Sequence, residues 1–289
     1  MRIGAVYPQN AMRGDPEAVR IIGLGAEELG FDSILFYDHV VGAEHADRDP
    51  ALWGPYTEAD AFHDPLVVFG YLAGITRCIE LATGILILPQ RQTVLVAQQA
   101  ADADLLSGGR VRLGVGTGWN WVEYEALGED YASRGARLDE QIDLLRRLWT
   151  EPLVTYRGAF HTLERCCINP RPARGIPIYV GGFSEPAFRR GGTTGDGFTF
   201  AGDVGEAIIG MERVRHHLHA SRRDLPDFPM ELIMTRARSA SEAGETAARW
   251  QDAGGTAVSV LTEKRGLDTP HAHVEYLEEV KSAVEGRVR

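Results

Sequence analysis

The chain has 289 residues, of which 44% are hydrophobic and 25% are charged, and its formal net charge is −11. This acidity argues against non-specific binding to nucleic acid or to an anionic membrane, because both require a basic surface. No apolar run approaches the roughly 20 residues of a membrane-spanning helix. Strand-like Ile3–Tyr7 follows Met1 and Arg2 with no secretion signal, so we expect a cytoplasmic protein.

After this first strand, Asp15 and Pro16 open a helix with a cap residue and an early proline. Ser33–Tyr37 is apolar and β-branched, and it predicts the second strand. Asp38 and His39 stand at the carboxyl end of that strand.

Residues 42–65 show no helical or strand period. An irregular loop of this length inside a compact domain is usually functional or mobile. It carries Trp53, Tyr56, Phe62 and His63, and these aromatic side chains either cover a flat apolar ligand or pin the loop to the body of the protein.

The middle of the chain alternates helices and strands. The predicted elements are a helix over Leu66–Thr76, a strand over Ile79–Pro89, an alanine-rich helix over Gln98–Leu106, a strand over Val111–Gly116 and a helix around Leu138–Trp149. Gly84 interrupts the strand at 79–89, which suggests a bulge or a close backbone approach.

Glycines at 114, 116 and 118 resemble a dinucleotide-binding fingerprint only loosely. The third glycine is misplaced for G-x-G-x-x-G, and Trp119-Asn120-Trp121 is a poor opening for a helix. We therefore reject a Rossmann fold.

Residues 150–175 form a predicted excursion, in which Val154–Tyr156 and Phe160–Leu163 pair as a small hairpin. Two of the three cysteines, Cys166 and Cys167, are adjacent there, and Cys78 is the third. A strained disulfide between the neighbours is the alternative to buried thiols, which we expect for all three.

Residues 176–200 read as one β-α-β unit. Ile176–Val180 is a strand, Gly181 and Gly182 end it, and Ser184 caps a short helix that stops at Gly191-Gly192. Backbone N–H groups and the helix dipole suit an anion at such a gap, most often a phosphate. A tight turn without a ligand is the other reading.

Further strands over Phe198–Phe200, Glu231–Thr235 and Thr256–Leu261 alternate with helices around Ala207–Leu218, Glu242–Ala253 and His273–Val284. Repeated right-handed crossovers close into a barrel. We predict one α/β domain over 1–289, a (β/α)8 TIM barrel with insertions at 42–65 and 150–175. The unusual strand ends at 38, 84, 117 and 181 then share one face.

The sequence resembles the luciferase-like flavin-dependent superfamily and, within it, the coenzyme F420-dependent oxidoreductases. The resemblance covers nearly the whole chain and rests on Y-D-H-V-V at 37–41, E-L-A-T-G-I-L-I-L-P-Q-R at 80–91, L-S-G-G-R at 106–110, G-V-G-T-G-W at 114–119, E-Y-E-A-L-G at 123–128, G-G-F-S at 181–184 and G-D-G-F at 195–198.

This resemblance implies a bacterial-luciferase-like barrel with a flavin or deazaflavin ring across its mouth. It implies a non-proline cis peptide at Gly84–Ile85, or at Thr83–Gly84, behind the ring. The residues expected to bind the cofactor are Asp38, His39, Thr83, Gly84, Ile85, Thr117, Asn120, Gly181, Gly182, Phe183 and Ser184. The loop 42–65 resembles the region that shapes the substrate pocket, so Trp53, Tyr56 and His63 are the expected substrate contacts.

The implied activity is hydride transfer between coenzyme F420 and a small organic substrate. His39 is the best candidate for a proton donor or acceptor, because imidazole titrates near neutral pH; its alternative is only a hydrogen bond to the ring or to a neighbouring backbone group. Asp38 orients this histidine or contacts the ring, and burial against the strand end is its alternative. Glu123 is a further catalytic candidate, although a solvated acid at a helix start is the preferred interpretation of this residue. A reduced-FMN monooxygenase is the alternative activity, and a non-catalytic flavin or deazaflavin binder is the alternative class.

We predict no metal site. A metal-dependent hydrolase would need converging His and Asp at several strand ends, and the sequence offers one such pair. His216, His217 and His219 could form a metal site, but a solvent-facing helix surface is the preferred interpretation. Relatives are often dimers, so the resemblance implies a homodimer.

Overall fold

The computed structural model describes residues 1–223, 225 and 227–288. The strands of the main sheet are β1 (Arg2–Val6), β2 (Ser33–Phe36), β3 (Glu80–Thr83), β4 (Leu86–Ile87), β5 (Val111–Gly116), β8 (Ile178–Gly181), β9 (Gly197–Ala201), β10 (Met230–Met234) and β11 (Ala257–Leu261). They pair in the order β3-β2-β1-β11-β10-β9-β8-β5-β4, and β3 also pairs with β5, which closes the ring. Because β3 and β4 are successive parts of one stave, the described strands form a closed eight-stave parallel barrel. The predicted (β/α)8 fold is confirmed.

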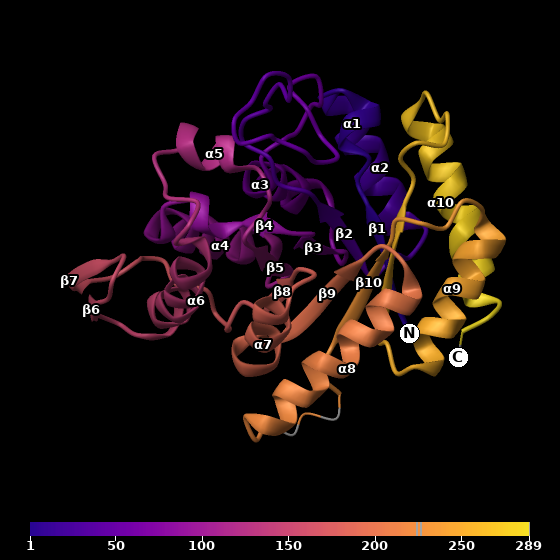
Figure 1. The fold of residues 1–289 in the computed structure, drawn as a ribbon. Coiled ribbons are helices and arrows are strands. Elements are labelled where there is room, and N and C mark those ends of the chain that lie inside the picture. The colour runs from indigo at the N-terminus through magenta and orange to yellow at the C-terminus, as the bar shows by residue number, and fades with distance from the viewer. Residues whose placement is uncertain (224, 226, 289) are drawn as a thin grey trace.

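The helices cover the outside of this barrel (Figure 1). They are α1 (Gln9–Met12), α2 (Pro16–Glu28), α3 (Pro65–Ile75), the 3-10 turn η1 (Leu88–Gln90), α4 (Thr93–Ser107), α5 (Trp121–Ala126), α6 (Arg134–Thr150), α7 (Glu185–Thr194), α8 (Val204–Ala220), α9 (Ala240–Asp252) and α10 (Pro270–Glu285). Asp15 caps α2 as predicted, because its side chain accepts a hydrogen bond from the N–H of Glu17. No helix in the described part of the chain has the length and apolar character to cross a bilayer.

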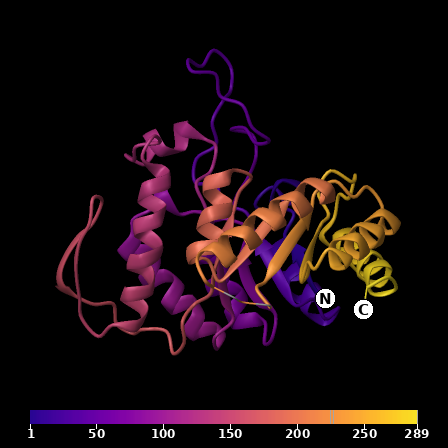
Figure 2. The same ribbon diagram turned by 60° about the horizontal axis from the view of Figure 1, so that its bottom comes forward.

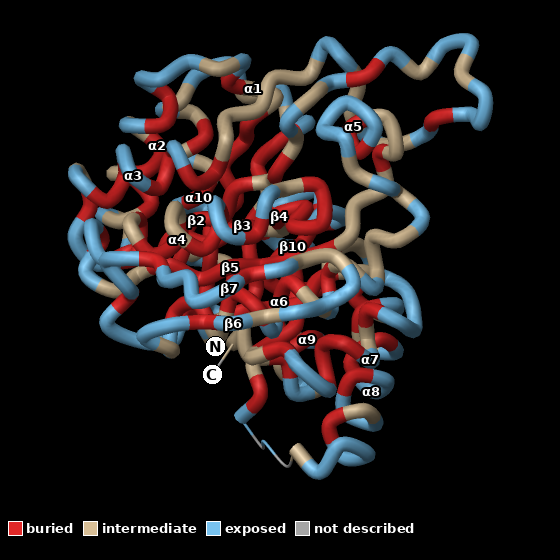
Figure 3. The backbone as a smooth tube through the Cα atoms, turned by 90° about the vertical axis from the view of Figure 1, so that its left-hand side faces the viewer, coloured by how far each residue is buried: buried red, intermediate tan, exposed pale blue. Residues whose placement is uncertain are grey.

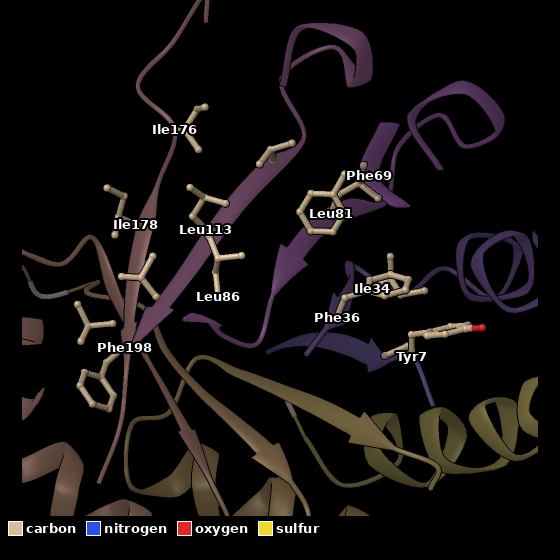
Figure 4. Packing of buried hydrophobic residues seen from close by; sticks show 14 of the residues in the cluster. Tyr7, Ile34, Phe36, Phe69, Leu81, Leu86, Leu113, Ile176, Ile178 and Phe198 are labelled. Atoms are coloured by element: carbon tan, nitrogen blue, oxygen red, sulfur yellow. The ribbon is translucent and has the colours of Figure 1, made fainter. Parts of the chain in front are cut away.

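The main hydrophobic core lies between the strands and the helices. Figure 4 shows it from close by, with Ile34, Leu81, Leu113 and Ile178 projecting from successive staves and Phe69 from α3. A second, smaller cluster of Val6, Leu35, Ala82 and Ile233 fills the barrel interior. The strands are therefore buried on both faces, as Figure 3 shows by their red colour, and this accounts for their continuous apolar sequence.

The floor of the barrel interior is polar. Arg112 is 3% exposed and donates to Glu231 at 2.8 Å (Nη1 to Oε2) and to Glu80 at 2.6 Å (Nε to Oε1). Ser259 and Thr199 donate their hydroxyls to the same Glu231 carboxylate. Burial opposes ionisation of Glu231, but Arg112 and these hydroxyls hold its pKa below the ordinary value. The network links strands β3, β5, β9, β10 and β11 around one buried charge pair.

The predicted hairpin in 150–175 is confirmed. Strands β6 (Val154–Arg157) and β7 (Thr162–Cys166) pair antiparallel outside the barrel, at the left edge of Figure 2. His161 fastens the hairpin to the helices, since its Nδ1 lies 2.7 Å from Oε1 of Glu140 on α6. Its Nε2 lies 2.6 Å from Oγ1 of Thr93 on α4.

Three local predictions are wrong. Helix α7 does not stop at Gly191-Gly192 but continues to Thr194. A Cβ on Gly191 would lie 2.3 Å from the ring of Phe198, and one on Gly192 would lie 2.5 Å from Cβ of His217. These glycines let α7 pack closely on β9 and α8, so their role is packing rather than termination.

The second error concerns the segment after β5, where α5 begins directly at Trp121. The side-chain oxygen of Asn120 accepts from the N–H groups of Val122 and Glu123 and caps this helix, so the tryptophans do not prevent it. The third concerns the cysteines, because Cys78, Cys166 and Cys167 are all free and exposed rather than buried. They lie in a helix-to-strand turn and at the end of the hairpin, where the core does not reach.

Candidate active site

A cavity of about 820 Å³ opens at the carboxyl ends of the barrel strands. Residues that directly follow β2, β3, β5 and β8 line it, together with side chains from β9 and β10 and from the loop 42–65. Its volume is in the range of small-molecule and cofactor sites. Carboxyl strand ends are where enzymes of this fold carry out their chemistry.

His39 lines this cavity and is held by a buried carboxylate. Nδ1 of His39 lies 2.9 Å from Oε2 of Glu123, which is 1% exposed. The other oxygen of Glu123 accepts from the backbone N–H groups of Val40 at 2.7 Å and Val41 at 3.1 Å. Glu123 is thus not a solvated acid at a helix start. It sits in the first turn of α5, where the helix dipole favours a negative charge, and it fixes the imidazole and the backbone that follows it.

Asp38 is also buried, but its carboxylate faces a different partner. Its oxygens accept from Nη2 of Arg91 at 2.6 Å and from the N–H of Ile87 at 2.8 Å. Burial raises the pKa of Asp38, and Arg91 opposes that shift. Arg91 also reaches Asp64, the N-cap of α3, at 2.8 Å. The carboxylate therefore ties the end of β2 to η1 and to the start of α3.

The wall beneath the cavity is a bulge between β3 and β4. The peptide bond Gly84–Ile85 is cis, at the first of the two predicted positions. The side chain of Ile85 turns inward, where a Cβ on Gly116 would lie 2.0 Å from its Cδ1 and a Cβ on Gly181 would lie 2.6 Å from its Cγ2. A Cβ on Gly114 would lie 2.2 Å from the carbonyl oxygen of Thr83. Glycine on β5 and β8 therefore makes room for the bulge.

The start of α7 forms another wall. Gly182 has φ +148°, a conformation that L side chains rarely adopt, and Phe183 beyond it is 77% exposed at the rim. Ser184 occupies the N-cap position of α7 as predicted, but the expected capping hydrogen bond of its side chain is not formed, so its hydroxyl leaves the first N–H groups of α7 unoccupied. Arg134 lines the same region, and its Nε is buried without a hydrogen-bond partner among the described residues.

The loop 42–65 closes the opposite part of the mouth and rises above the barrel in Figure 2. Three aromatic rings surround His39: the centroid of its ring lies 5.1 Å from that of Tyr56, 4.8 Å from that of Phe62 and 5.6 Å from that of Trp119. Gly54 packs so tightly on Trp119 that a Cβ there would lie 2.3 Å from its ring. The loop is irregular, as predicted, and it packs against the segment that follows β5.

The structure brings most of the predicted site residues to one cavity. Its lining includes Asp38, His39, Trp53, Tyr56, Gly84, Ile85, Thr117, Gly181, Gly182, Phe183 and Ser184. Thr83, Asn120, Glu123 and His63 do not line it. Thr83 donates to the carbonyl oxygen of Gly114, Asn120 caps α5, and the backbone N–H of His63 donates to Gln9.

Several lining residues were not predicted. Arg134 and Arg190 stand at the α6 and α7 side, and Trp119 lies beside His39. Arg91 lies behind Asp38. In the sequence, nothing distinguishes these arginines from surface arginines of α6 and α7. Trp119 lies in the G-V-G-T-G-W motif, which could have drawn attention to it.

In the described residues, no group of three or more His, Cys, Asp or Glu side chains is arranged to hold a metal ion. His217 on α8 instead pairs with Glu185, its Nε2 lying 2.7 Å from Oε1.

Comparison with known proteins extends these observations. A sequence model of the family described as "Luciferase-like monooxygenase" matches residues 3–283. An uncharacterized protein of Mycobacterium tuberculosis strain H37Rv is 33% identical over 203 residues, which cover 66% of this chain and 68% of that protein. An F420-dependent glucose-6-phosphate dehydrogenase of Nakamurella multipartita is 32% identical over 197 residues, covering 66% and 54%.

Solved structures share the fold at low sequence identity. An F420-dependent secondary alcohol dehydrogenase in complex with an F420–acetone adduct has a TM-score of 0.78 and 17% identity, with 98% of each chain covered. The oxygenating constituent of 3,6-diketocamphane monooxygenase of Pseudomonas putida, in complex with FMN, has a TM-score of 0.78 and 14% identity. It covers 100% of this chain and 99% of that one.

Proposed function

The chain belongs to the luciferase-like monooxygenase family of oxidoreductases, and from that premise we propose that it is a coenzyme F420-dependent oxidoreductase. It would transfer a hydride between the deazaflavin and a small organic substrate. The names of its curated relatives support this cofactor. The observation that carries the proposal is the His39–Glu123 pair, which presents an oriented imidazole at the mouth of the barrel.

The residues of the cavity fit a flat ring with an anionic tail. Ile85, Ile87 and Ile233 supply apolar walls. The start of α7 supplies backbone N–H groups, and the guanidinium of Arg134, which lines the same cavity, supplies positive charge. On this proposal Gly181, Gly182, Phe183 and Ser184 hold the tail, while Gly84 and Ile85 back the ring.

When bound, a deazaflavin supplies the hydride chemistry, and the protein supplies position and proton transfer. The carboxylate of Glu123 accepts a hydrogen bond from Nδ1–H of His39. Nε2 is therefore the nitrogen that takes a proton from the substrate or returns it. Tyr56, Phe62 and Trp119 keep water from the imidazole. Asp38 holds the bulged wall through the N–H of Ile87, which is a positioning role.

The test of cofactor identity is a fluorescence titration of the purified apoprotein with coenzyme F420 and, separately, with FMN. We expect saturable binding of F420. Micromolar binding of FMN without binding of F420 would instead support the second candidate, a reduced-FMN monooxygenase, which the FMN-bound structural relative favours. Reaction of the reduced cofactor with oxygen separates the two activities, because a deazaflavin has carbon in place of the ring nitrogen and does not readily form the flavin peroxide.

The alternative that the protein is a non-catalytic flavin or deazaflavin binder is tested with the variant His39→Ala. We expect turnover to fall about 10²- to 10⁴-fold, the range for loss of a general acid or base, while the F420 dissociation constant changes by only a few-fold. Phe62→Leu, which removes an aromatic ring beside His39 but no proton carrier, is the matched control. Unchanged turnover in His39→Ala would remove this residue from the mechanism.

We also propose that the protein is a cytoplasmic homodimer. Helices α3 and α4 pack side by side and expose six large apolar side chains. These are Val67, Tyr71, Val94, Leu95, Leu105 and Leu106, called here the α3/α4 face. Helix α3 carries no charged residue, and Gly70 and Gly74 leave open space beside it. An apolar face of this kind suits a self-complementary contact about a two-fold axis.

A further inference from the structure

We propose that the substrate is an uncharged, mainly apolar alcohol or ketone, and not a sugar phosphate or another anion. This inference rests on the proposed function and concerns the part of the same cavity that the cofactor would leave open. It differs from the substrate in the names of the curated relatives.

The positive charge of the cavity is confined to one side. Among the described lining residues, the arginines are Arg134, at the start of α6, and Arg190, within α7. Arg134 lies 3.7 Å above the ring of Tyr131 and donates to its carbonyl oxygen. Arg190 donates to Asp139 at 2.6 Å and to the carbonyl oxygen of Gly135 at 3.0 Å. Both line the cavity together with Ser184 and Pro186 of the α7 start, where the cofactor tail would meet their positive charge.

The strand order separates this region from His39. The loop 42–65 follows β2, whereas α7 follows β8, and β3/β4 and β5 stand between these two staves on the shorter path around the barrel. A ring held at α7 and backed by Gly84 and Ile85 would leave the space toward the loop 42–65 open, and a substrate would fit between the ring and this loop.

That space is aromatic. Trp53, Tyr56 and Trp119 line the cavity there, and Phe62 packs on Tyr56 with ring centroids 4.9 Å apart. Trp53 is 79% exposed, so its ring is free to cover a ligand at the rim. Such rings bury a large apolar area and favour planar or aliphatic groups over hydrated ions. A hydroxyl or carbonyl oxygen would have Nε2 of His39 as its polar partner.

Two acids, Glu263 and Asp60, lie near Tyr56. Glu263 is 8% exposed and accepts from the N–H of Asn10 at 3.2 Å, and Asp60 accepts from the N–H of Thr57 at 2.7 Å. Burial raises the pKa of Tyr56 above its ordinary value, and Glu263 and Asp60 raise it further. Among the described residues, no lysine or arginine lines the cavity on this side, so an anionic substrate would find no lining cation here.

The experiment measures binding and needs no turnover. Protein saturated with reduced F420 is titrated by calorimetry with 1-phenylethanol, with cyclohexanol and with glucose 6-phosphate. Because an alcohol cannot reduce an already reduced cofactor, the heat reports binding alone. We expect both alcohols to bind saturably and glucose 6-phosphate to give no binding heat.

Variants then locate the site. Trp53→Ala should weaken 1-phenylethanol binding about tenfold, because the ligand would lose the aromatic ring that covers it at the rim, whereas Ile209→Ala, at an exposed apolar position on α8, should not change it. Binding of glucose 6-phosphate that is lost in Arg134→Gln, or failure of both alcohols to bind, would overturn the substrate assignment. Loading with F420 precedes the titration. If the protein binds FMN and not F420, the proposed function is wrong. The substrate class is then tested separately by titrating the FMN-bound protein with the same three ligands.

Discussion

Ile85 is the residue around which the interior of the barrel mouth is shaped. Its side chain points inward from the bulge between β3 and β4, and the facing positions on β5 and β8 have no side chain. Gly116 and Gly181 accommodate this side chain, while Gly114 accommodates the carbonyl of Thr83. The glycines are thus explained by packing between staves, even before any ligand is considered.

This packing predicts different costs for two substitutions. Gly116→Ala meets the flexible tip of Ile85, whereas Gly114→Ala meets backbone at 2.2 Å. We expect Gly116→Ala to lower the free energy of unfolding by about 1–3 kcal/mol, as overpacking does, and Gly114→Ala to lower it more. Urea denaturation measures both.

The matched control is Ile85→Ala, which removes the clashing atoms. Combined with Gly116→Ala, it should recover part of the lost stability, and combined with Gly114→Ala it should recover none. Equal recovery in both pairs would show that the two glycines face the same obstacle.

At the scale of strands, the polar floor of the barrel connects elements that are distant in the sequence. Arg112 of β5 holds Glu231 of β10, and removal of the guanidinium would leave a buried, unpaired carboxylate. We expect Arg112→Met to cost about 3–5 kcal/mol of unfolding free energy. The double variant with Glu231→Gln should be less destabilised than Arg112→Met alone, and denaturant titration would reveal the difference.

The same pair predicts the response to acid. The pKa of Glu231 is lower in the folded protein than the ordinary value of 4.5. Its contribution to stability is therefore complete well above pH 4.5 and decreases as the pH falls below that value. The slope of unfolding free energy against pH in this acidic range should be smaller in Glu231→Gln. An unchanged slope would assign the acid sensitivity to other carboxylates.

Helices α3 and α4 give a prediction about assembly. Introducing a charge at two positions of the α3/α4 face, Val67→Glu with Leu106→Glu, should convert a dimer into a monomer, because two carboxylates would have to be buried at the interface. Size-exclusion chromatography with light scattering measures the mass. Ile209→Glu on α8 is the control, and a wild-type protein that is already monomeric would refute the proposed pairing.

For the whole molecule, the architecture and most of the predicted residues of the cavity lining can be derived from the sequence. The strands are short, apolar and β-branched, and residues at carboxyl strand ends necessarily meet on one face of a closed parallel barrel. This is why Asp38, Gly84, Thr117 and Gly181 could be grouped before their positions were known.

The sequence-based predictions are wrong or incomplete for residues whose role depends on a partner far away in the sequence. Glu123 resembled a solvated acid because its bond to His39 spans 84 positions. Gly191 resembled a helix stop because nothing in the local sequence shows that Phe198 lies against it. Arg134 and Arg190 reach the cavity through the packing of α6 on α7, which local patterns do not encode.

The bonds from Glu123 to the backbone of Val40 and Val41 also determine where the loop 42–65 can pivot. Because these two residues are anchored to α5, the hinge of any opening motion lies beyond them, near Gly42, which packs against Glu58 at the far side of the loop. Tyr56 and Phe62 of the loop pack against the ring of His39, so displacement of the loop would expose the imidazole to water, while Glu123 would still hold its Nδ1. The position of the proton carrier is thus fixed from α5, whereas its shielding depends on the loop.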